Sequence, residues 1–125
     1  MSRPLRILIV DDEFLIADYI ASVVEEAGHT VVGTAASADE AMRLLIEEKP
    51  DVAILDIKID GDRDGIELAT EMQAAGLEVP HVFITGSGDP RTKTRAEATG
   101  PIAFLQKPLN APQLEVALRA VRLER

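Results

Sequence analysis

The sequence of 125 residues contains no cysteine and no tryptophan, and its only aromatic residues of the Phe, Trp and Tyr types are three phenylalanines and one tyrosine. The absence of cysteine excludes disulfide bonds, thiol nucleophiles and zinc sites built from cysteine. No apolar stretch approaches the roughly 18 residues that a membrane span needs, and ILIV at 7–10 is too short for the core of a signal peptide. We therefore expect a cytoplasmic protein without a membrane contact.

Basic residues are also scarce: 13 Lys and Arg stand against 22 Asp and Glu, which gives a net charge of −9. This balance argues against direct binding of nucleic acid, which needs a basic face. Hydrophobic residues make up 46% of the chain, enough for a packed core, and one domain is the default at this length. We expect residues 1–125 to form a single domain with no further domain attached.

Short apolar runs alternate with amphipathic stretches along the whole chain. The runs at 5–10, 30–35, 52–55, 81–85 and 102–105 read as strands, and the stretches at 14–27, 37–48, 66–75, 90–99 and 110–121 read as helices. Ser37, Asp64 and Asn110 are the expected helix caps. Alternation of this kind, with nearly continuous apolar strands, favours a parallel sheet covered on both faces. The fold class is therefore a doubly wound α/β sandwich.

The fourth of these helices differs from the others in composition. Asp89-Pro90 is a good helix start, with a capping residue followed by proline at the first helical position. The following segment, RTKTRAEATG at 91–100, contains no large apolar residue. Because burial would contribute little to its stability, we expect a weak, mobile helix.

Four of the five expected strands end in polar residues. These are Asp11-Asp12, Asp56, Thr85 and Lys107. In a parallel sheet the carboxyl ends of the strands share one rim, and ligands bind there. Three carboxylates at such a rim repel one another, by roughly 4 kcal/mol for two charges 4 Å apart at an effective dielectric constant of 20. A cation is therefore implied.

The residue types at this rim suit Mg²⁺ and a phosphoryl group. Mg²⁺ prefers oxygen ligands and often shares its shell with phosphate. Lys107 can pair with an anion, Thr85 can donate a hydrogen bond to a phosphoryl oxygen, and a carboxylate such as Asp56 can accept phosphorus as a nucleophile. Such transfer needs mainly positioning and charge neutralisation.

Four motifs at the strand ends carry a resemblance to a known family. They are ILIVDDE at 7–13, AILD at 53–56, FITG at 83–86 and FLQKP at 104–108. With them, the chain resembles the receiver domain of two-component response regulators over essentially its whole length. The resemblance implies the flavodoxin-like strand order 2-1-3-4-5. It also implies a stand-alone receiver that catalyses at most its own phosphorylation and dephosphorylation.

The resemblance assigns roles to the rim residues. Asp56 would be the phosphoacceptor, supplied by a sensor histidine kinase or a histidine phosphotransfer protein. Asp12, Asp56 and the backbone carbonyl of Lys58 would bind Mg²⁺ directly, and Asp11 would act through a metal-bound water. Lys107 would pair with Asp56 at rest and with a phosphoryl oxygen afterwards.

The resemblance also implies a switch. Thr85 would move toward the phosphoryl group, and Phe104 would fill the space that it leaves. The surface of the fourth helix, fifth strand and fifth helix would then bind a downstream protein or a second copy of the chain. Lys107-Pro108 would be a cis peptide, and Lys58 and Ser87 would tune the lifetime of the phosphoryl group.

Acidic and basic residues are distributed unevenly along the chain. Residues 1–85 carry 18 acidic and 6 basic side chains, whereas residues 86–125 carry 4 acidic and 7 basic ones. The acidic part includes the expected cation site. Because residues 86–125 have a small excess of basic side chains, we expect a mildly basic partner surface.

Three features depart from the usual receiver pattern. Asp60 stands where receivers often have proline, and the loop from Asp56 to Asp64 is one residue longer than usual. Phe104 replaces a tyrosine found in many relatives. VFITGSG at 82–88 is similar to a subgroup with a Phe-X-Thr-Gly stretch, in which the following helix is apt to be loose.

Two further roles stay open for a receiver, namely a phosphate sink and a relay of the phosphoryl group. Functions outside the receiver family fit the sequence less well. A phosphatase of the haloacid dehalogenase type would need a second aspartate two residues after Asp56, where Lys58 stands. A binding-only pseudo-receiver would not need the intact acidic pair. DGDRDGIELATE at 60–71 matches the calcium loop of an EF-hand, but an expected strand precedes it, where that motif needs a helix.

Overall fold

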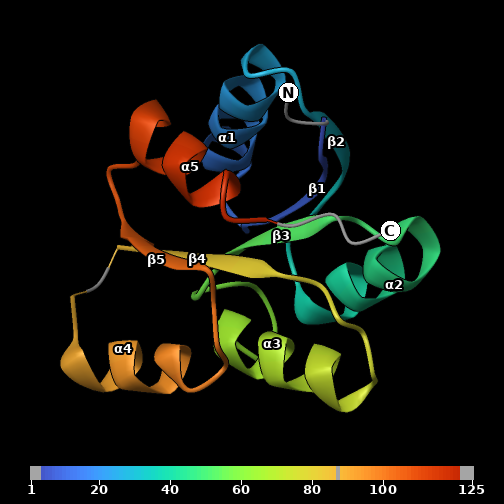
Figure 1. Cartoon of the computed structure of the whole chain (residues 1–125). Helices are drawn as coiled ribbons and strands as arrows, with labels where there is room; N and C mark the ends of the chain where they lie inside the picture. The colour runs from blue at the N-terminus through green and yellow to red at the C-terminus, as the bar shows by residue number, and fades with distance from the viewer. Residues whose placement is uncertain (1–3, 87, 122–125) are drawn as a thin grey trace.

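Five strands alternate with five helices in the computed structural model, which describes residues 4–86 and 88–121 (Figure 1). The strands are β1 (Arg6–Val10), β2 (Thr30–Ala35), β3 (Val52–Asp56), β4 (His81–Thr85) and β5 (Ala103–Gln106). The helices are α1 (Phe14–Glu26), α2 (Ala38–Glu48), α3 (Gly65–Ala74), α4 (Pro90–Glu97) and α5 (Ala111–Leu118).

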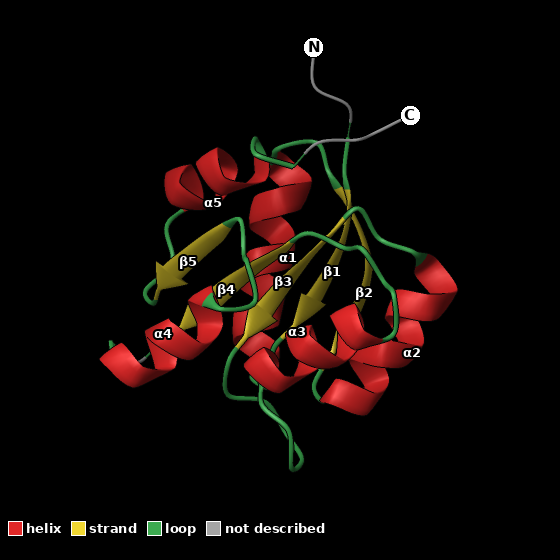
Figure 2. Ribbon diagram, turned by 60° about the horizontal axis from the view of Figure 1, so that its bottom comes forward, coloured by secondary structure: helices red, strands yellow, loops and turns green. Residues whose placement is uncertain are grey.

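All four strand pairings are parallel, and the sheet order is β2-β1-β3-β4-β5. Figure 2 shows the strands running side by side, with β2 and β5 at the two edges. Both the expected α/β class and the expected strand order are confirmed. The parallel arrangement brings the carboxyl ends of all five strands to the same rim.

Two hydrophobic layers hold the sheet between its helices. On one face, Leu8 and Val10 of β1 pack in a cluster with buried residues of α2, α3 and α4. On the other face, Ile7 and Ile9 pack with α1 and α5. This alternation within one strand follows from the two-residue repeat of strand side chains. Figure 1 shows the same division, with α1 and α5 on one side of the sheet and the other three helices on the opposite side.

Helix α1 buries a narrower face than the helical spacing of its apolar residues predicts. Ala17, Ile20, Val23 and Val24 are buried. Phe14 and Ala27 also stand at helical spacing with this face, but both are exposed, Phe14 to 78%. Phe14 is the first helical residue, next to the rim where the strands end, and it belongs to neither hydrophobic cluster.

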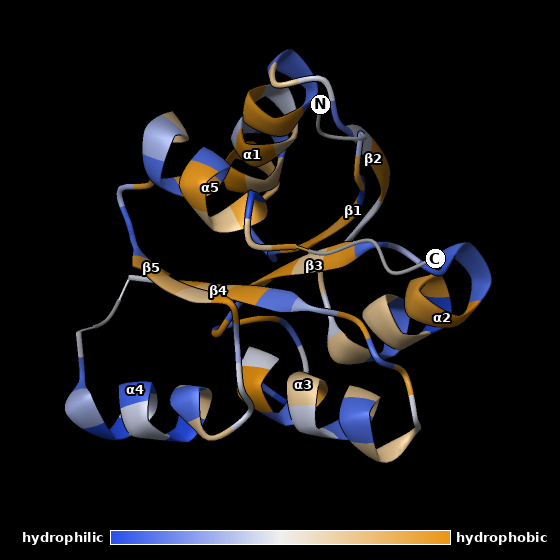
Figure 3. Cartoon of the chain, viewed as in Figure 1, coloured by the Kyte–Doolittle hydropathy of each residue, from blue (hydrophilic) through white to orange (hydrophobic). Residues whose placement is uncertain are grey.

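Helix α4 forms despite its lack of large apolar residues. Asp89 caps it, with a side chain that accepts a hydrogen bond from the backbone N–H of Arg91 at 3.2 Å. Ala96 is its only buried residue. Figure 3 shows α4 as mostly hydrophilic. The expectation that burial contributes little to this helix is confirmed.

The other expected caps are present. The Ser37 hydroxyl accepts from the backbone N–H of Glu40, and Asn110 accepts from that of Gln113. Asp64 forms a capping box with Glu67, in which each side chain accepts from the other's backbone N–H. These caps satisfy N–H groups that a helix leaves unpaired at its start.

Gly65 is required by a close approach of two backbones. It is the first residue of α3, and its N–H donates to the carbonyl oxygen of Ile57 at 2.7 Å. A Cβ atom at Gly65 would overlap the backbone carbonyl of Asp56. The start of α3 therefore lies directly against the end of β3.

We predict that Gly65→Ala lowers the free energy of unfolding by about 1–3 kcal/mol, because the backbone of Asp56 must shift to admit the methyl group. Urea unfolding measures the loss. Gly86→Ala is the matched control, since a Cβ there meets nothing within 4 Å. Equal stability losses in the two variants would contradict this explanation.

Candidate functional site

The rim of the sheet gathers the residues that the sequence places at strand ends. Asp11 follows β1, Asp56 and Thr85 end β3 and β4, and Lys107 follows β5. Asp11, Asp56 and Thr85 are each only 4% exposed, whereas Asp12 is exposed. The parallel topology thus buries two carboxylates and one hydroxyl at a single place.

Lys107 places its positively charged ammonium group among the carboxylates of this rim. Its Nζ donates to Oδ2 of Asp56 at 3.1 Å, and it lies 3.6 Å from Oδ2 of Asp11 and 3.5 Å from Oε1 of Glu13. Burial lowers the pKa of Lys107, but its contacts with these carboxylates outweigh that effect and raise it. The ammonium group is therefore charged at neutral pH.

Burial and Lys107 act in opposite directions on Asp56. Burial is the largest effect and, together with the charge of Asp11, raises the pKa of Asp56 from 3.8 to about 6. The hydrogen bond and charge of Lys107 oppose this rise, as does a backbone hydrogen bond from Lys58. At pH 7 the carboxylate is thus mostly ionised, although it is buried.

Glu13 belongs to this group and was missed by the sequence analysis. One ligand atom from each of Asp11, Asp12, Glu13 and Asp56 lies within 4.8 Å of the others. The backbone N–H of Glu13 also donates to Oδ1 of Asp11 at 2.8 Å, which orients that carboxylate. The run DDE at 11–13 contained the signal, but a glutamate at the start of a helix is common without any such role.

This group of oxygen atoms fits a divalent cation. All its ligand atoms are carboxylate oxygens, the kind that Mg²⁺ prefers. Oδ2 of Asp11 is buried and has no hydrogen-bond partner among the described residues. A bound cation would satisfy that oxygen and reduce the repulsion between the carboxylates.

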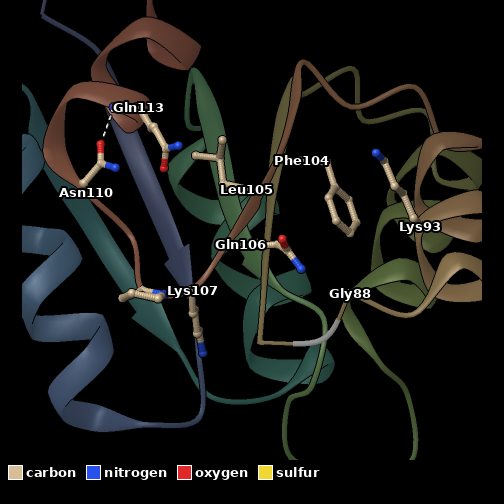
Figure 4. A pocket seen from close by; sticks show the side chains of 9 residues that line it. Gly88, Lys93, Phe104, Leu105, Gln106, Lys107, Asn110 and Gln113 are labelled. Atoms are coloured by element: carbon tan, nitrogen blue, oxygen red, sulfur yellow. Dashed lines mark hydrogen bonds between the residues drawn. The ribbon is translucent and has the colours of Figure 1, made fainter.

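Phe104 lies between the rim and α4. It is partly buried, it packs against the hydrophobic cluster on that face, and it pairs in register with Phe83 of β4. Figure 4 shows its ring beside Lys93, whose Nζ is 6.0 Å from the ring centroid. Its strand, β5, is the neighbour of β4, which ends at Thr85.

The remaining sequence-predicted residues are placed as follows. The Lys107–Pro108 bond is cis, as the resemblance implies. Lys58 is exposed, two residues after Asp56, and Ser87 lies outside the described residues. The segment 60–71 follows β3 rather than a helix, so it lacks the preceding helix of an EF-hand. Its Glu71 pairs with Arg63 at 2.5 Å.

Across residues 4–86 and 88–121, the structure contains no helix with the length and apolar character of a membrane span.

The chain resembles known proteins over nearly its whole length. The family model for the response regulator receiver domain matches residues 7–119. Among curated proteins, the nitrogen assimilation regulatory protein NtrX of Azorhizobium caulinodans is 39% identical over 95% of this chain and 27% of its own length. The transcriptional regulatory protein PdtaR of Mycobacterium tuberculosis is 35% identical over 95% of this chain and 59% of its own. The chain thus spans less than two thirds of the length of each of these relatives.

Solved structures agree with this likeness. The signal receiver domain of a modulated diguanylate cyclase from Desulfovibrio desulfuricans G20 superposes with a TM-score of 0.87 at 34% identity, covering 95% of this chain and 94% of that one. NtrX from Brucella abortus gives a TM-score of 0.85 at 33% identity over 95% of this chain and 27% of that one.

The raised pKa of Asp56 predicts a pH dependence of stability in the absence of metal. Between about pH 4 and about pH 6 the folded state holds a proton that the unfolded state has released, so the free energy of unfolding falls as the pH rises. We expect a fall on the order of 1–3 kcal/mol in EDTA, measured by urea unfolding at each pH.

Asp56→Asn serves as the comparison, because the amide does not titrate. Its stability should fall much less over the same range. A slope equal to that of the unsubstituted protein would show that Asp56 does not carry the effect.

Proposed function

Because the chain belongs to the response regulator receiver domain family, we propose that it is a phosphoacceptor switch in two-component signalling, with Asp56 as the acceptor. The observation that carries the proposal is the contact between the buried Asp56 carboxylate and the Lys107 ammonium, beside an acidic cluster that fits a divalent cation. The donor would be the phosphohistidine of a sensor histidine kinase or of a histidine phosphotransfer protein.

The proposed transfer forms one bond and breaks one. A carboxylate oxygen of Asp56 attacks the phosphorus atom, and the bond from phosphorus to the histidine nitrogen breaks, so the histidine leaves and is reprotonated by solvent. Asp56 suits this role because it is mostly ionised at pH 7. The product is an acyl phosphate on Asp56.

The residues around Asp56 would hold Mg²⁺ and the transferred group. Asp12, Asp56 and the backbone carbonyl of Lys58 would bind the metal directly, and Asp11 would bind it through water. Bound Mg²⁺ would neutralise charge on the phosphoryl oxygens. Lys107 lies 3.1 Å from Asp56, so only a small displacement separates it from an oxygen of the new phosphoryl group.

We propose that Thr85 and Phe104 convert this chemistry into a change of surface. The Thr85 hydroxyl would donate to a phosphoryl oxygen, and Phe104 would move into the space that it leaves. Phe104 lines a pocket of about 480 Å³ on the face formed by α4, β5 and α5, together with Lys93, Gln106 and Gln113 (Figure 4). A shift of its ring would therefore reshape this face.

The α4-β5-α5 face is also the proposed partner surface. Helix α4 carries Arg91, Lys93 and Arg95 against the single acid Glu97, which makes this face mildly basic. A downstream protein, or a second copy of the chain, is the expected partner, with no direct contact to nucleic acid or membrane. The proposed location is the cytoplasm, and the only proposed catalysis is the chain's own phosphorylation and dephosphorylation.

We predict that incubation with acetyl phosphate and Mg²⁺ adds the mass of one phosphoryl group to the intact protein, because a small acyl phosphate can replace the histidine donor. Asp56→Asn should abolish the adduct, while Asp62→Asn, which removes a fully exposed carboxylate from the following loop, should leave it intact. No adduct on the unsubstituted protein, or an adduct that survives Asp56→Asn, would refute the proposed function.

We also predict that beryllofluoride, added in the presence of Mg²⁺, shifts the backbone amide resonances of α4 and β5. The physical reason is the movement of Thr85 toward a group that resembles the phosphoryl group, while Phe104 moves into the space that Thr85 leaves. Thr85→Ala should reduce the shifts in α4 and β5 without removing those at Asp56. Shifts confined to residues 10–13 and 56–60 would argue against a switch.

A further inference from the structure

The buried contacts of α4 gather at its carboxyl end. Between Gly88 and Gly100, only Ala96 and Thr99 are buried. Ala96 belongs to the hydrophobic cluster that contains buried residues of α2 and α3. Thr99 follows the last residue of α4 by two positions and is only 9% exposed, although its side chain is polar. Because a buried hydroxyl group needs hydrogen-bond partners, the contacts of Thr99 show how this end of the helix is held.

Thr99 is bonded to strand β4 through His81. Nε2 of His81, the first residue of β4, lies 2.9 Å from Oγ1 of Thr99 in a buried contact. Oγ1 of Thr99 also donates to the carbonyl oxygen of Ala96 at 2.7 Å, so it can accept from an N–H group at Nε2. The His81 ring packs edge to face with Phe83, with 5.1 Å between the ring centroids. Burial lowers the pKa of His81, so the ring is neutral at neutral pH.

Gln73 of α3 holds the same residue from a second side. Its Nε2 donates to the backbone carbonyl oxygen of Thr99 at 2.7 Å. Figure 1 shows the end of α4 from which the chain turns back toward β5 lying beside α3. Thr99 is thus bonded to both β4 and α3. We call the three residues His81, Gln73 and Thr99 the carboxyl-end anchor of α4.

The earlier part of α4 contacts the rest of the molecule through exposed side chains. Nη2 of Arg95 lies 3.1 Å from Oδ2 of Asp64, and these side chains are 52% and 27% exposed. Nζ of Lys93, which is also exposed, lies 6.0 Å from the centroid of the Phe104 ring. Exposed ion pairs contribute little to stability, because water screens the charges. The strongest restraints on α4 therefore lie at its carboxyl end.

The two ends of α4 lie near opposite ends of β4. Thr85, the last residue of β4, is at the rim, and α4 begins five residues later at Pro90. His81, the first residue of β4, contacts Thr99 at the other end of the helix. Four residues of a strand span about 13 Å. A movement of Thr85 at the rim therefore takes place near the start of α4 and far from the carboxyl-end anchor.

We propose that α4 pivots about the carboxyl-end anchor, so that the segment 90–95 moves while Thr99 stays bonded to His81 and Gln73. This inference rests on the switch of the proposed function and adds which end of the helix moves. A pivot keeps the buried hydrogen bonds, whereas a slide of the whole helix would break them. The partner surface therefore changes most around Lys93, beside Phe104.

The test measures the movement of each end of α4 separately in the whole chain. The natural sequence has no cysteine, so introduced cysteines can carry spin labels at chosen positions. Arg91→Cys and Ala98→Cys label the two ends, and each is paired with Glu25→Cys on α1; all three positions are exposed. At 1.5 Å per helical residue, position 91 is about 12 Å from Thr99 and position 98 about 1.5 Å. A pivot at Thr99 thus moves position 91 about eight times as far as position 98.

Distances between the labels are measured by double electron–electron resonance, with and without beryllofluoride and Mg²⁺. We expect the distance from 25 to 91 to change several times more than the distance from 25 to 98. Equal changes at the two ends would show a slide of the whole helix and overturn the pivot. No change at either end, while the amide resonance of Asp56 shows bound beryllofluoride, would overturn it as well.

Thr99→Val tests the anchor in the resting protein, because it removes the hydroxyl group but keeps a branched side chain of similar size. Thr94→Val is the matched control, since the exposed Thr94 hydroxyl donates only within the helix, to the carbonyl oxygen of Pro90 at 2.9 Å. Both variants lose a bond to their own helix, but only Thr99→Val loses the contact with His81. We expect hydrogen exchange of amides 97–100 to become about five- to thirtyfold faster in Thr99→Val and less than about twofold faster in the control.

Gln73→Met removes the other contact of the anchor from an exposed position on α3, and it should speed the exchange of the same amides. Equal exchange in Thr99→Val and Thr94→Val would refute the anchor. An adduct on Asp56 together with that result would leave the proposed function standing. If neither acetyl phosphate nor beryllofluoride binds, the proposed function and the pivot that depends on it both fail, and the exchange comparison decides the anchor alone.

Discussion

The contact between Lys107 and Asp56 is the interaction on which the rest of the site depends. Burial alone would favour the neutral form of Asp56, and a neutral carboxyl group is a poor nucleophile. The ammonium group, 3.1 Å away, opposes this effect and keeps the pKa at about 6. The sheet order makes the contact possible, because only β4 lies between β3, which ends at Asp56, and β5, which Lys107 follows. The fold thus supplies a buried carboxylate that is still charged.

The site has two further connections to the surrounding helices. Gly65 allows α3 to start directly against the backbone of Asp56, and Asp64, the cap of α3, binds Arg95 of α4 at 3.1 Å. Lys93 of the same helix lies over Phe104. Helix α4 is therefore joined to the cap of α3 by an ion pair and to β5 by a cation over an aromatic ring, while Ala96 is its only buried residue. Such a helix has little burial to lose if it moves, which suits the proposed switch.

The sequence was sufficient for the architecture and for the residues at the strand ends. Apolar runs that stop at Asp56 or Thr85 mark both the end of a strand and the rim, and caps such as Asp64 follow from local hydrogen bonding. The sequence was not sufficient where contacts between distant segments determine which side chains are buried or paired. Phe14 has helical spacing with the buried residues of α1 but lies outside the hydrophobic clusters. The place of Glu13 beside Lys107 and Asp56 depends on segments far apart in the chain, so no local pattern reveals it.

The central claim is that Lys107 keeps a buried Asp56 ionised at neutral pH. The most direct test is a ¹³C NMR titration of the Asp56 carboxyl group, in the absence of Mg²⁺, in the unsubstituted protein and in Lys107→Met. The account predicts a pKa of about 6 in the first and a clearly higher value in the second, because burial and the charge of Asp11 then act without opposition. An ordinary pKa near 4 in the unsubstituted protein, or no change on removal of Lys107, would contradict it.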